Sequence, residues 1–409
     1  MFVPKDGAKS RKNRMPAFRI EKFTPHLTHI ITKSYNFASG AATQTAARNG
    51  PGPTDNISIR MKRFVISLLA LLAAGTAAAD AQQILAGAGF STMFDNREYS
   101  GNRFDISQTM FSARLTPRVG IEWNERNRVV AAVDLLQNFG DNERFLTRAR
   151  PLMYYRFNSR NVTAAAGIFD RSELSEDAYP LAMIGDSVRY YDNRVQGFMG
   201  RYTSSLRGDT YVELSLDWCG MLGPTSRERF RILSAGRYTA GWFRFGYALQ
   251  LYHYAMTMNG GGVSDNTMVY PYVGARFDAY FDFDVELGAL VAPQRIRSSG
   301  KGWEMPAGGQ LKLRMSRWGV FLENTLYCGD SLMPHINQFE EGDFYCGERF
   351  WSTTKGIYNR TEIGYSRKFF DGTLEVGAGL RLHYDGVGMG TSQQIRVRVD
   401  LEKVFRKKQ

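Results

Sequence analysis

The sequence has few of the residues that build metal centres, disulfide frameworks or hydrolytic sites, with three cysteines and five histidines among 409 residues. Cys219, Cys328 and Cys346 are odd in number, which excludes a fully paired disulfide framework. Cys328 and Cys346 flank one long segment, so a bond between them stays open in an oxidising compartment. No HExxH pattern, paired-cysteine spacing or serine nucleophile motif accompanies the histidines. The sequence therefore predicts no metal, no cofactor and no enzymatic activity.

Long apolar runs are also missing, which excludes a transmembrane helix of about 20 residues. The one compact apolar segment runs from Phe64 to Ala74 and is too short to span a bilayer. It follows Lys62 and Arg63 and precedes a small-x-small cleavage site at residues 79–81. This order is typical of a bacterial secretory signal, so residues 61–81 are predicted to be a cleaved signal peptide. The alternative is a buried apolar helix of a soluble domain.

Residues 1–60 lack any apolar period and are rich in polar residues, glycine and proline, so they are predicted to be disordered. A second Met-Lys-Arg start at Met61 suggests that the true protein begins there, with a basic nucleic-acid-binding arm as the alternative. The full chain has a net charge of +12, but residues 82–409 hold 40 basic and 36 acidic residues, a net charge of +4. The remaining chain therefore gives no reason to expect a nucleic-acid partner.

From residue 82 onward, apolar and polar residues alternate in segments of about ten residues. In residues 373–385, Leu374, Val376 and Leu380 face one way, and Glu375 and Arg381 face the other. Tight turns are predicted near residues 124–127, 158–161, 205–209, 239–241, 282, 316–317 and 371–372. Longer polar loops fall near residues 95–107, 140–147, 170–188, 219–228, 257–268, 293–304, 329–355 and 385–391. Residues 82–409 are therefore predicted to form an all-β, transmembrane, antiparallel up-and-down barrel of about 16 strands. A strand count of roughly 14 to 18 is compatible with the pattern.

An aromatic residue stands close to almost every predicted tight turn and at the end of the last strand. Such rings suit a membrane interface, because one side is apolar and the other can meet water. The alternative is a large soluble β-sandwich. The predicted rim consists of Trp123, Phe157, Tyr202, Tyr238, Phe281, Trp318, Phe369 and Phe405.

On these features, residues 84–405 resemble the 16-stranded outer-membrane porins of Gram-negative bacteria. The resemblance implies location in the outer membrane, contact with its lipid, insertion by the barrel-insertion machinery and assembly as a homotrimer. It also implies a water-filled channel for passive diffusion of small hydrophilic solutes. The best-known porins end on the aromatic residue itself, whereas four residues follow Phe405 here.

In the porins the third long loop folds inward, and its carboxylates face basic residues of the wall. The corresponding loop here, residues 170–188, is predicted to constrict the pore with Asp170, Glu173, Glu176, Asp177 and Asp186. The predicted basic partners on the wall are Arg114, Arg118, Arg381, Arg396 and Arg398. The alternative is that these loop acids are merely solvated. Because lumen charges are mixed, neither the ion selectivity nor the solute follows from the sequence.

Two other functions remain open. A structural or adhesive barrel plugged by its own loops would show no conductance. A barrel enzyme would need a histidine at its site, and His383, on an inward face close to Asp385, is the residue we would suspect. The longest loop, residues 329–355, is compatible with a surface cap, a subunit latch or a partner site.

Overall fold

The computed structural model describes residues 82–99, 107–175, 177–206, 209–335, 344–353 and 356–405. The predicted arm, the signal peptide, Glu176 and the four residues after Phe405 lie outside these ranges. The strands are β1 (Gln82–Glu98), β2 (Gln108–Trp123), β3 (Asn127–Asn138), β4 (Arg148–Asn158), β5 (Val162–Asp170), β6 (Arg194–Thr203), β7 (Tyr211–Gly220), β8 (Arg229–Ala240), β9 (Phe243–Tyr254), β10 (Ser264–Asp278), β11 (Asp282–Val291), β12 (Gln294–Ile296), β13 (Ala307–Arg317), β14 (Val320–Gly329), β15 (Gly356–Phe369), β16 (Leu374–Tyr384) and β17 (Met389–Phe405). The described helices are η1 (Arg171–Glu173), α3 (Asp186–Tyr191), η2 (Arg297–Ser299) and α4 (Arg349–Thr353).

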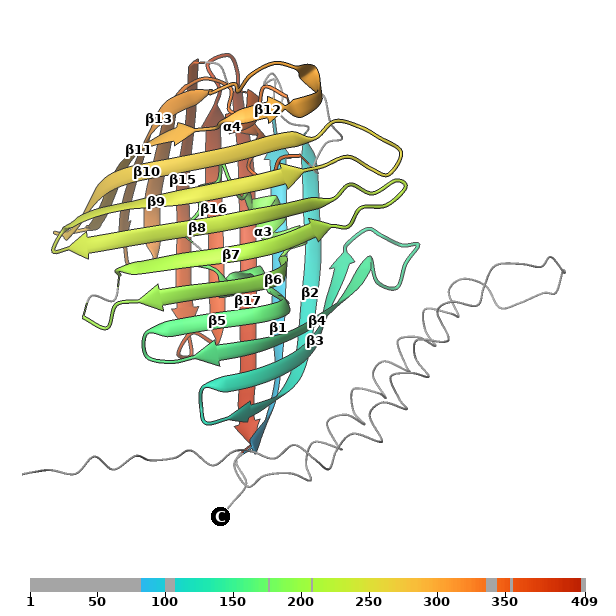
Figure 1. The fold of residues 1–409 in the computed structure, drawn as a ribbon. Helices are drawn as coiled ribbons and strands as arrows, with labels where there is room; N and C mark the ends of the chain where they lie inside the picture. Colours follow the sequence, from blue (N-terminus) through green and yellow to red (C-terminus); the bar gives the residue numbers. More distant parts are fainter. Residues whose placement is uncertain are drawn as a thin grey trace, which may run out of the picture. The chain divides into compact units, whose positions relative to one another are not determined.

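These strands form one closed antiparallel sheet, shown in Figure 1, in which each long strand pairs with its neighbours in sequence. β1 closes the barrel by pairing with both β2 and β17, so that Phe90 lies opposite Leu115 on one side and Val399 on the other. The short strand β12 continues β11 beyond Pro293 and keeps pairing with β10. Counted with β11 and β12 as one strand, the seventeen segments form a 16-stranded barrel, which confirms the predicted fold class.

The burial pattern of the strands is inverted with respect to a soluble protein. In β2, Ser112 and Arg114 are buried in the interior, whereas Phe111 and Leu115 are exposed on the outside. Closure removes sheet edges, so all ladder groups are paired within the protein, as a lipid environment requires. A closed barrel with an apolar outer face is the architecture of an outer-membrane protein.

Short turns and long loops alternate around the barrel as predicted, except that the long loop predicted at residues 385–391 is a connection of residues 385–388, because β17 already begins at Met389. The turn between β2 and β3 holds Asn124 and Glu125 at positive φ, and the turn between β13 and β14 holds Trp318 and Gly319 there. Positive φ at both central residues is the mark of the type I′ turn, whose twist matches that of the flanking strands. These tight turns fix one rim, and the opposite rim is free to carry long loops.

Among the described residues, no helix is long and apolar enough to cross a membrane.

Candidate functional site

The third long loop connects β5 to β6 and lies inside the barrel, behind the strands that face the viewer in Figure 1. It carries η1 directly after β5 and α3 directly before β6. The loop therefore extends to residue 193, five residues beyond its predicted end, because residues 189–191 form the last turn of α3.

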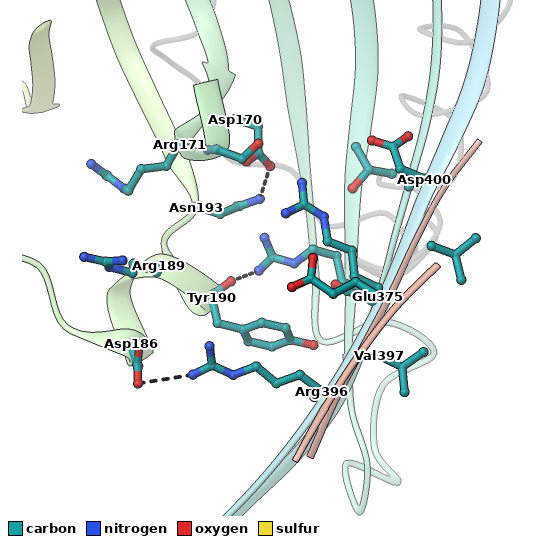
Figure 2. A pocket seen from close by; sticks show the side chains of 18 of the residues that line it. Asp170, Arg171, Asp186, Arg189, Tyr190, Asn193, Glu375, Arg396, Val397 and Asp400 are labelled. Carbon is teal, nitrogen blue, oxygen red and sulfur yellow. Dashed lines mark hydrogen bonds and ion pairs between the residues drawn. The ribbon is translucent and has the colours of Figure 1, made fainter. Parts of the chain in front are cut away.

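Asp186, the first residue of α3, is the acid that the structure places against the predicted basic wall. Its carboxylate lies 2.7 Å from Arg381 Nη1 and 3.1 Å from Arg396 Nη2, on β16 and β17. Burial alone would raise the pKa of this carboxyl, but the two guanidinium groups hold it well below its usual range. Asp186 is therefore a fixed anion that ties the start of α3 to the wall (Figure 2).

The other end of α3 is held by arginines of β2 and β4. Arg114 donates to the carbonyl oxygen of Tyr190, and Arg148 donates to that of Tyr191. Cationic groups are favourable at a helix C-terminus, where carbonyl groups lack intrahelical partners. Arg148 was not predicted from the sequence. Its partner is a backbone carbonyl group, so no acidic residue marks the contact.

Of the predicted loop acids that the structure describes, Asp186 alone pairs with Arg381 and Arg396. Asp170 accepts a hydrogen bond from Ser172 N at 2.8 Å and caps η1. Glu173 lies 3.2 Å from Arg156, a wall residue that was not predicted. Burial raises the pKa of the Glu173 carboxyl, and Arg156 opposes that rise. Asp177 is exposed.

Two of the predicted wall arginines, Arg118 and Arg398, have neighbours on the wall itself. Arg118 pairs with Asp400 and, at 3.2 Å, with Glu402, which are residues of the wall itself. Arg398 is exposed and lies across the strand pair from Glu375. The wall therefore carries its own ion pairs as well as those to the third loop.

The described part of the longest loop also folds inward and packs against the third loop. Gly185 N donates to the carbonyl oxygen of Cys346 at 2.7 Å, and Asp186 N donates to Glu348 Oε1 at 2.8 Å. The hydroxyl of Tyr345 donates to the carbonyl oxygen of Ala182 at 2.7 Å. We call residues 171–193 and 344–353 together the inner plug. Because it lies within the barrel, this part of the loop is not the surface cap that the sequence allowed.

The inner plug has an apolar core on the loop side of the lumen. Met183, Phe350 and Trp351 are fully buried, and Trp351 Nε1 donates to Gln310 Oε1 on β13 at 3.1 Å. The plug reaches the wall on other sides too, since Phe344 O accepts a hydrogen bond from Asn266 of β10. The loop-side half of the lumen is thus largely filled with protein.

A cavity of about 590 Å³ remains between the third loop and the wall. It is lined from the loop side by Asp186, Tyr190 and Asn193, and from the wall by residues of β1–β4 and β13–β17. Figure 2 shows Arg396 extending from the wall to Asp186 across this space, with Val397 on the opposite side of the strand. The lining is rich in charged groups, as expected of a water-accessible space.

All eight predicted rim aromatics lie at the short-turn end of their strands or in the turns themselves. Trp242 and Tyr280 lie in the same turns and were missed, although both are exposed. Arg317 places its guanidinium carbon 4.0 Å from the centre of the Tyr280 ring and 4.5 Å from that of Trp318. An anchoring role at the membrane interface stays a prediction.

His383 is buried in an aromatic stack. Its ring lies parallel to that of Phe350 with a centroid distance of 4.5 Å, and Nδ1 is 2.8 Å from the hydroxyl of Tyr358. The neighbouring carboxylate of Asp385 accepts the backbone N–H groups of Val387 and Gly388. These contacts describe a packed histidine and a turn-forming aspartate.

The three cysteines are free thiols. Cys328 is exposed on the outer face of β14, whereas Cys346 is buried in the inner plug. The wall therefore separates the two residues, and a disulfide between them is wrong for this structure. Among the described residues, no group of histidine, cysteine and acidic side chains is arranged to hold a metal ion.

Solved structures to which the chain is similar include three bacterial proteins. The outer membrane protein OpdK of Pseudomonas aeruginosa is 10% identical, with 78% of this chain and 99% of that chain covered and a TM-score of 0.46. OccK11 (OpdR) of the same organism is 8% identical over 78% and 96%, with a TM-score of 0.47. OprB of Pseudomonas putida is 9% identical over 78% and 94%, with a TM-score of 0.46. No curated protein sequence matches the chain.

At the level of sequence families, the model described as lipid A 3'-O-deacylase-type matches residues 77–283, just over half of the chain. The matched region covers β1 to β10 and the first residues of β11. The chain belongs to the lipid A 3'-O-deacylase-type family.

Proposed function

We propose that this protein is a narrow outer-membrane channel through which small hydrophilic solutes diffuse passively. The observation that carries the proposal is the charged cavity of about 590 Å³ between the third loop and the wall of β1, β16 and β17. Barrels of 16 strands are wide enough to hold water, and here the inner plug restricts that water to one part of the lumen. The wall-bound α3 sets the narrow point of the path.

The ion pairs at Asp186 support this assignment. A lumen that was dry throughout would need its charges matched or replaced by apolar groups. Here the side chain of Arg396 is 44% exposed although it contacts Asp186, so this pair borders water. The proposed path therefore passes along a surface that is already hydrated.

The test is single-channel conductance of the protein purified from outer membranes and inserted into a planar bilayer. Ser91 lines the cavity from the inner face of β1, and Ala88 lies on the outer face of the same strand. We expect Ser91→Trp to lower the unit conductance because its ring occupies the cavity, and Ala88→Trp to leave the conductance unchanged. A barrel that inserts but shows no openings would instead indicate a lumen sealed by the inner plug. Equal effects of the two substitutions would contradict the proposed path.

A second candidate function is removal of the acyl chain at the 3'-O position of lipid A. The observation that favours it is the family match, which extends over the first ten strands. Ester hydrolysis requires an activated nucleophile and a base within hydrogen-bond reach. His383 is the histidine of the sequence closest to such a role, but its ring is packed against Phe350 and Tyr358.

Mass spectrometry of lipid A from cells with and without the protein separates the two functions. A deacylase would lower the lipid A mass by one acyl chain in the cells that hold the protein. The channel proposal predicts the same lipid A mass in both strains.

A further inference from the structure

We infer that the channel selects small oxyanions, such as carboxylates and phosphates, at the guanidinium groups that Arg396 and Arg398 present to the cavity. The inference rests on the proposed channel function and adds the substrate class. It starts from the charges of the lining, in which ten arginines and seven carboxylates occur among the described residues. The sequence alone left the sign of selectivity open.

The depth of each partner decides which charge a solute meets. The Asp186 carboxylate is 9% exposed and its partner Arg396 is 44% exposed. The same order holds for Glu173 at 14% and Arg156 at 30%. In these pairs the carboxylate lies beneath the guanidinium group, so the positive end of each pair faces the water.

Arg398 adds a further positive charge close to this surface. It follows Arg396 by two residues on β17, so both side chains point to the same side of the strand. It is exposed, and its neighbours across the sheet are Ser91 on β1 and Glu375 on β16. A guanidinium fork with exposed N–H groups matches the geometry of a carboxylate or phosphate.

Negative side chains also line the cavity. Near the turns the order reverses, because Asp400 is 45% exposed and its partner Arg118 is 15% exposed. Asp170 is half-buried on the loop side, where Asn193 and the Ser172 amide donate to it. The part of the path beside α3 is therefore positive, Glu375 lies level with Arg398 on β16, and Asp400 and Glu402 follow on the turn side of Arg398.

The first experiment measures reversal potentials across a planar bilayer in a gradient of potassium chloride. Low ionic strength is used because the Debye length is about 10 Å at 0.1 M salt. We expect chloride to be several-fold more permeant than potassium in the wild type. Arg398→Gln should reduce this preference, and Arg398→Glu should reduce it further.

The matched control is Arg367→Gln, which removes the same charge from an exposed arginine on the outer face of β15. The control should leave the permeability ratio unchanged. Conduction with a preference for potassium in the wild type would overturn the inference and leave the channel proposal standing. So would equal shifts in the Arg398 and Arg367 variants.

A second measurement does not depend on conduction. Titration calorimetry of the solubilised wild type with inorganic phosphate should show binding, weakened about fivefold in Arg398→Gln, the change expected for one charge lost at close range in water. The Arg367→Gln variant should bind as the wild type does. A silent barrel that binds phosphate in this pattern would refute the channel but keep the anion site, whereas absence of phosphate binding would refute the site.

Discussion

The ion pairs of Asp186 make the third loop sensitive to a single substitution. Replacing Asp186 with asparagine keeps the size of the side chain but removes the charge that Arg381 and Arg396 share. Removing one partner of a buried pair costs about 3–5 kcal/mol. The lower end applies here, because Arg381 keeps a contact of 2.8 Å to Glu362 and Arg396 is partly exposed to water. A cost of about 3 kcal/mol corresponds to a roughly 150-fold larger population of the open loop.

Hydrogen exchange of the backbone amides in residues 181–191 measures this opening directly. We expect Asp186→Asn to accelerate exchange in this segment while the strands keep their protection. Asp177→Asn is the control, because it removes the same charge from an exposed position of the same loop. Unchanged exchange in Asp186→Asn, or equal acceleration in both variants, would refute the role of the ion pairs in holding α3.

The pH dependence of the same exchange follows from the pKa of Asp186, which is held well below its usual value. A carboxyl with a depressed folded pKa contributes stability that is present above its unfolded pKa. That stability is lost only as the pH falls through the folded pKa. We therefore expect no loss of loop protection in the wild type when the pH falls from about 7 to about 4.5. A loss of protection with a midpoint near pH 5 would show that another group controls the loop.

Three further predictions concern the wall and the inner plug. Val397→Arg, on the outer face, should lower the free energy of unfolding by about 2–4 kcal/mol, whereas Arg398→Ala should change permeation more than stability; equal losses in urea titrations would contradict the assigned faces. Trp351→Ala should destabilise the inner plug by about 3–5 kcal/mol and raise the unit conductance, because a fully buried ring and its bond to Gln310 are lost; an unchanged conductance would place the path elsewhere. Glu348→Gln should accelerate loop exchange less than Asp186→Asn does. Burial raises the pKa of Glu348 against the opposing effect of Arg97, and the amide of glutamine resembles the neutral carboxyl group. A larger acceleration in Glu348→Gln than in Asp186→Asn would refute this reasoning.

The barrel could be predicted from the sequence because its rules are local. Alternation with a period of two residues assigns each side chain to a face, and β7 shows the predicted pattern, with Glu213 and Asp217 buried inside and Leu214 exposed outside. Turn residues such as Asn124 mark one rim. Even β1, whose sequence has little pattern, is fixed once its two neighbours are known, since it closes the sheet.

The inner plug could not be predicted because its contacts are not local. Asp186 N and Glu348 Oε1 form a hydrogen bond across 162 positions of sequence, and no periodic pattern marks either segment. The longest loop is rich in aromatic residues, as loops at a barrel rim commonly are. In the structure, however, Phe344, Phe350 and Trp351 of this loop are buried as in a protein core. Of the predicted wall arginines, Arg381 and Arg396 contact the acid of the third loop, but Arg118 pairs within the wall. Composition identifies the charges, and only the fold selects the pairs.

The position of the candidate site follows from the polar interior of this barrel. The lipid takes the apolar face of every strand, so the inner face is polar and cannot by itself form a dry core. The loops supply the missing apolar groups, with Met183, Phe350 and Trp351 packed at the loop side. This core holds α3 in place, and the wall arginines bind both ends of that helix. The charged cavity remains beside the wall of β1–β4 and β13–β17, and in the proposed channel the exposed guanidinium groups of Arg396 and Arg398 are the groups that a solute would meet there.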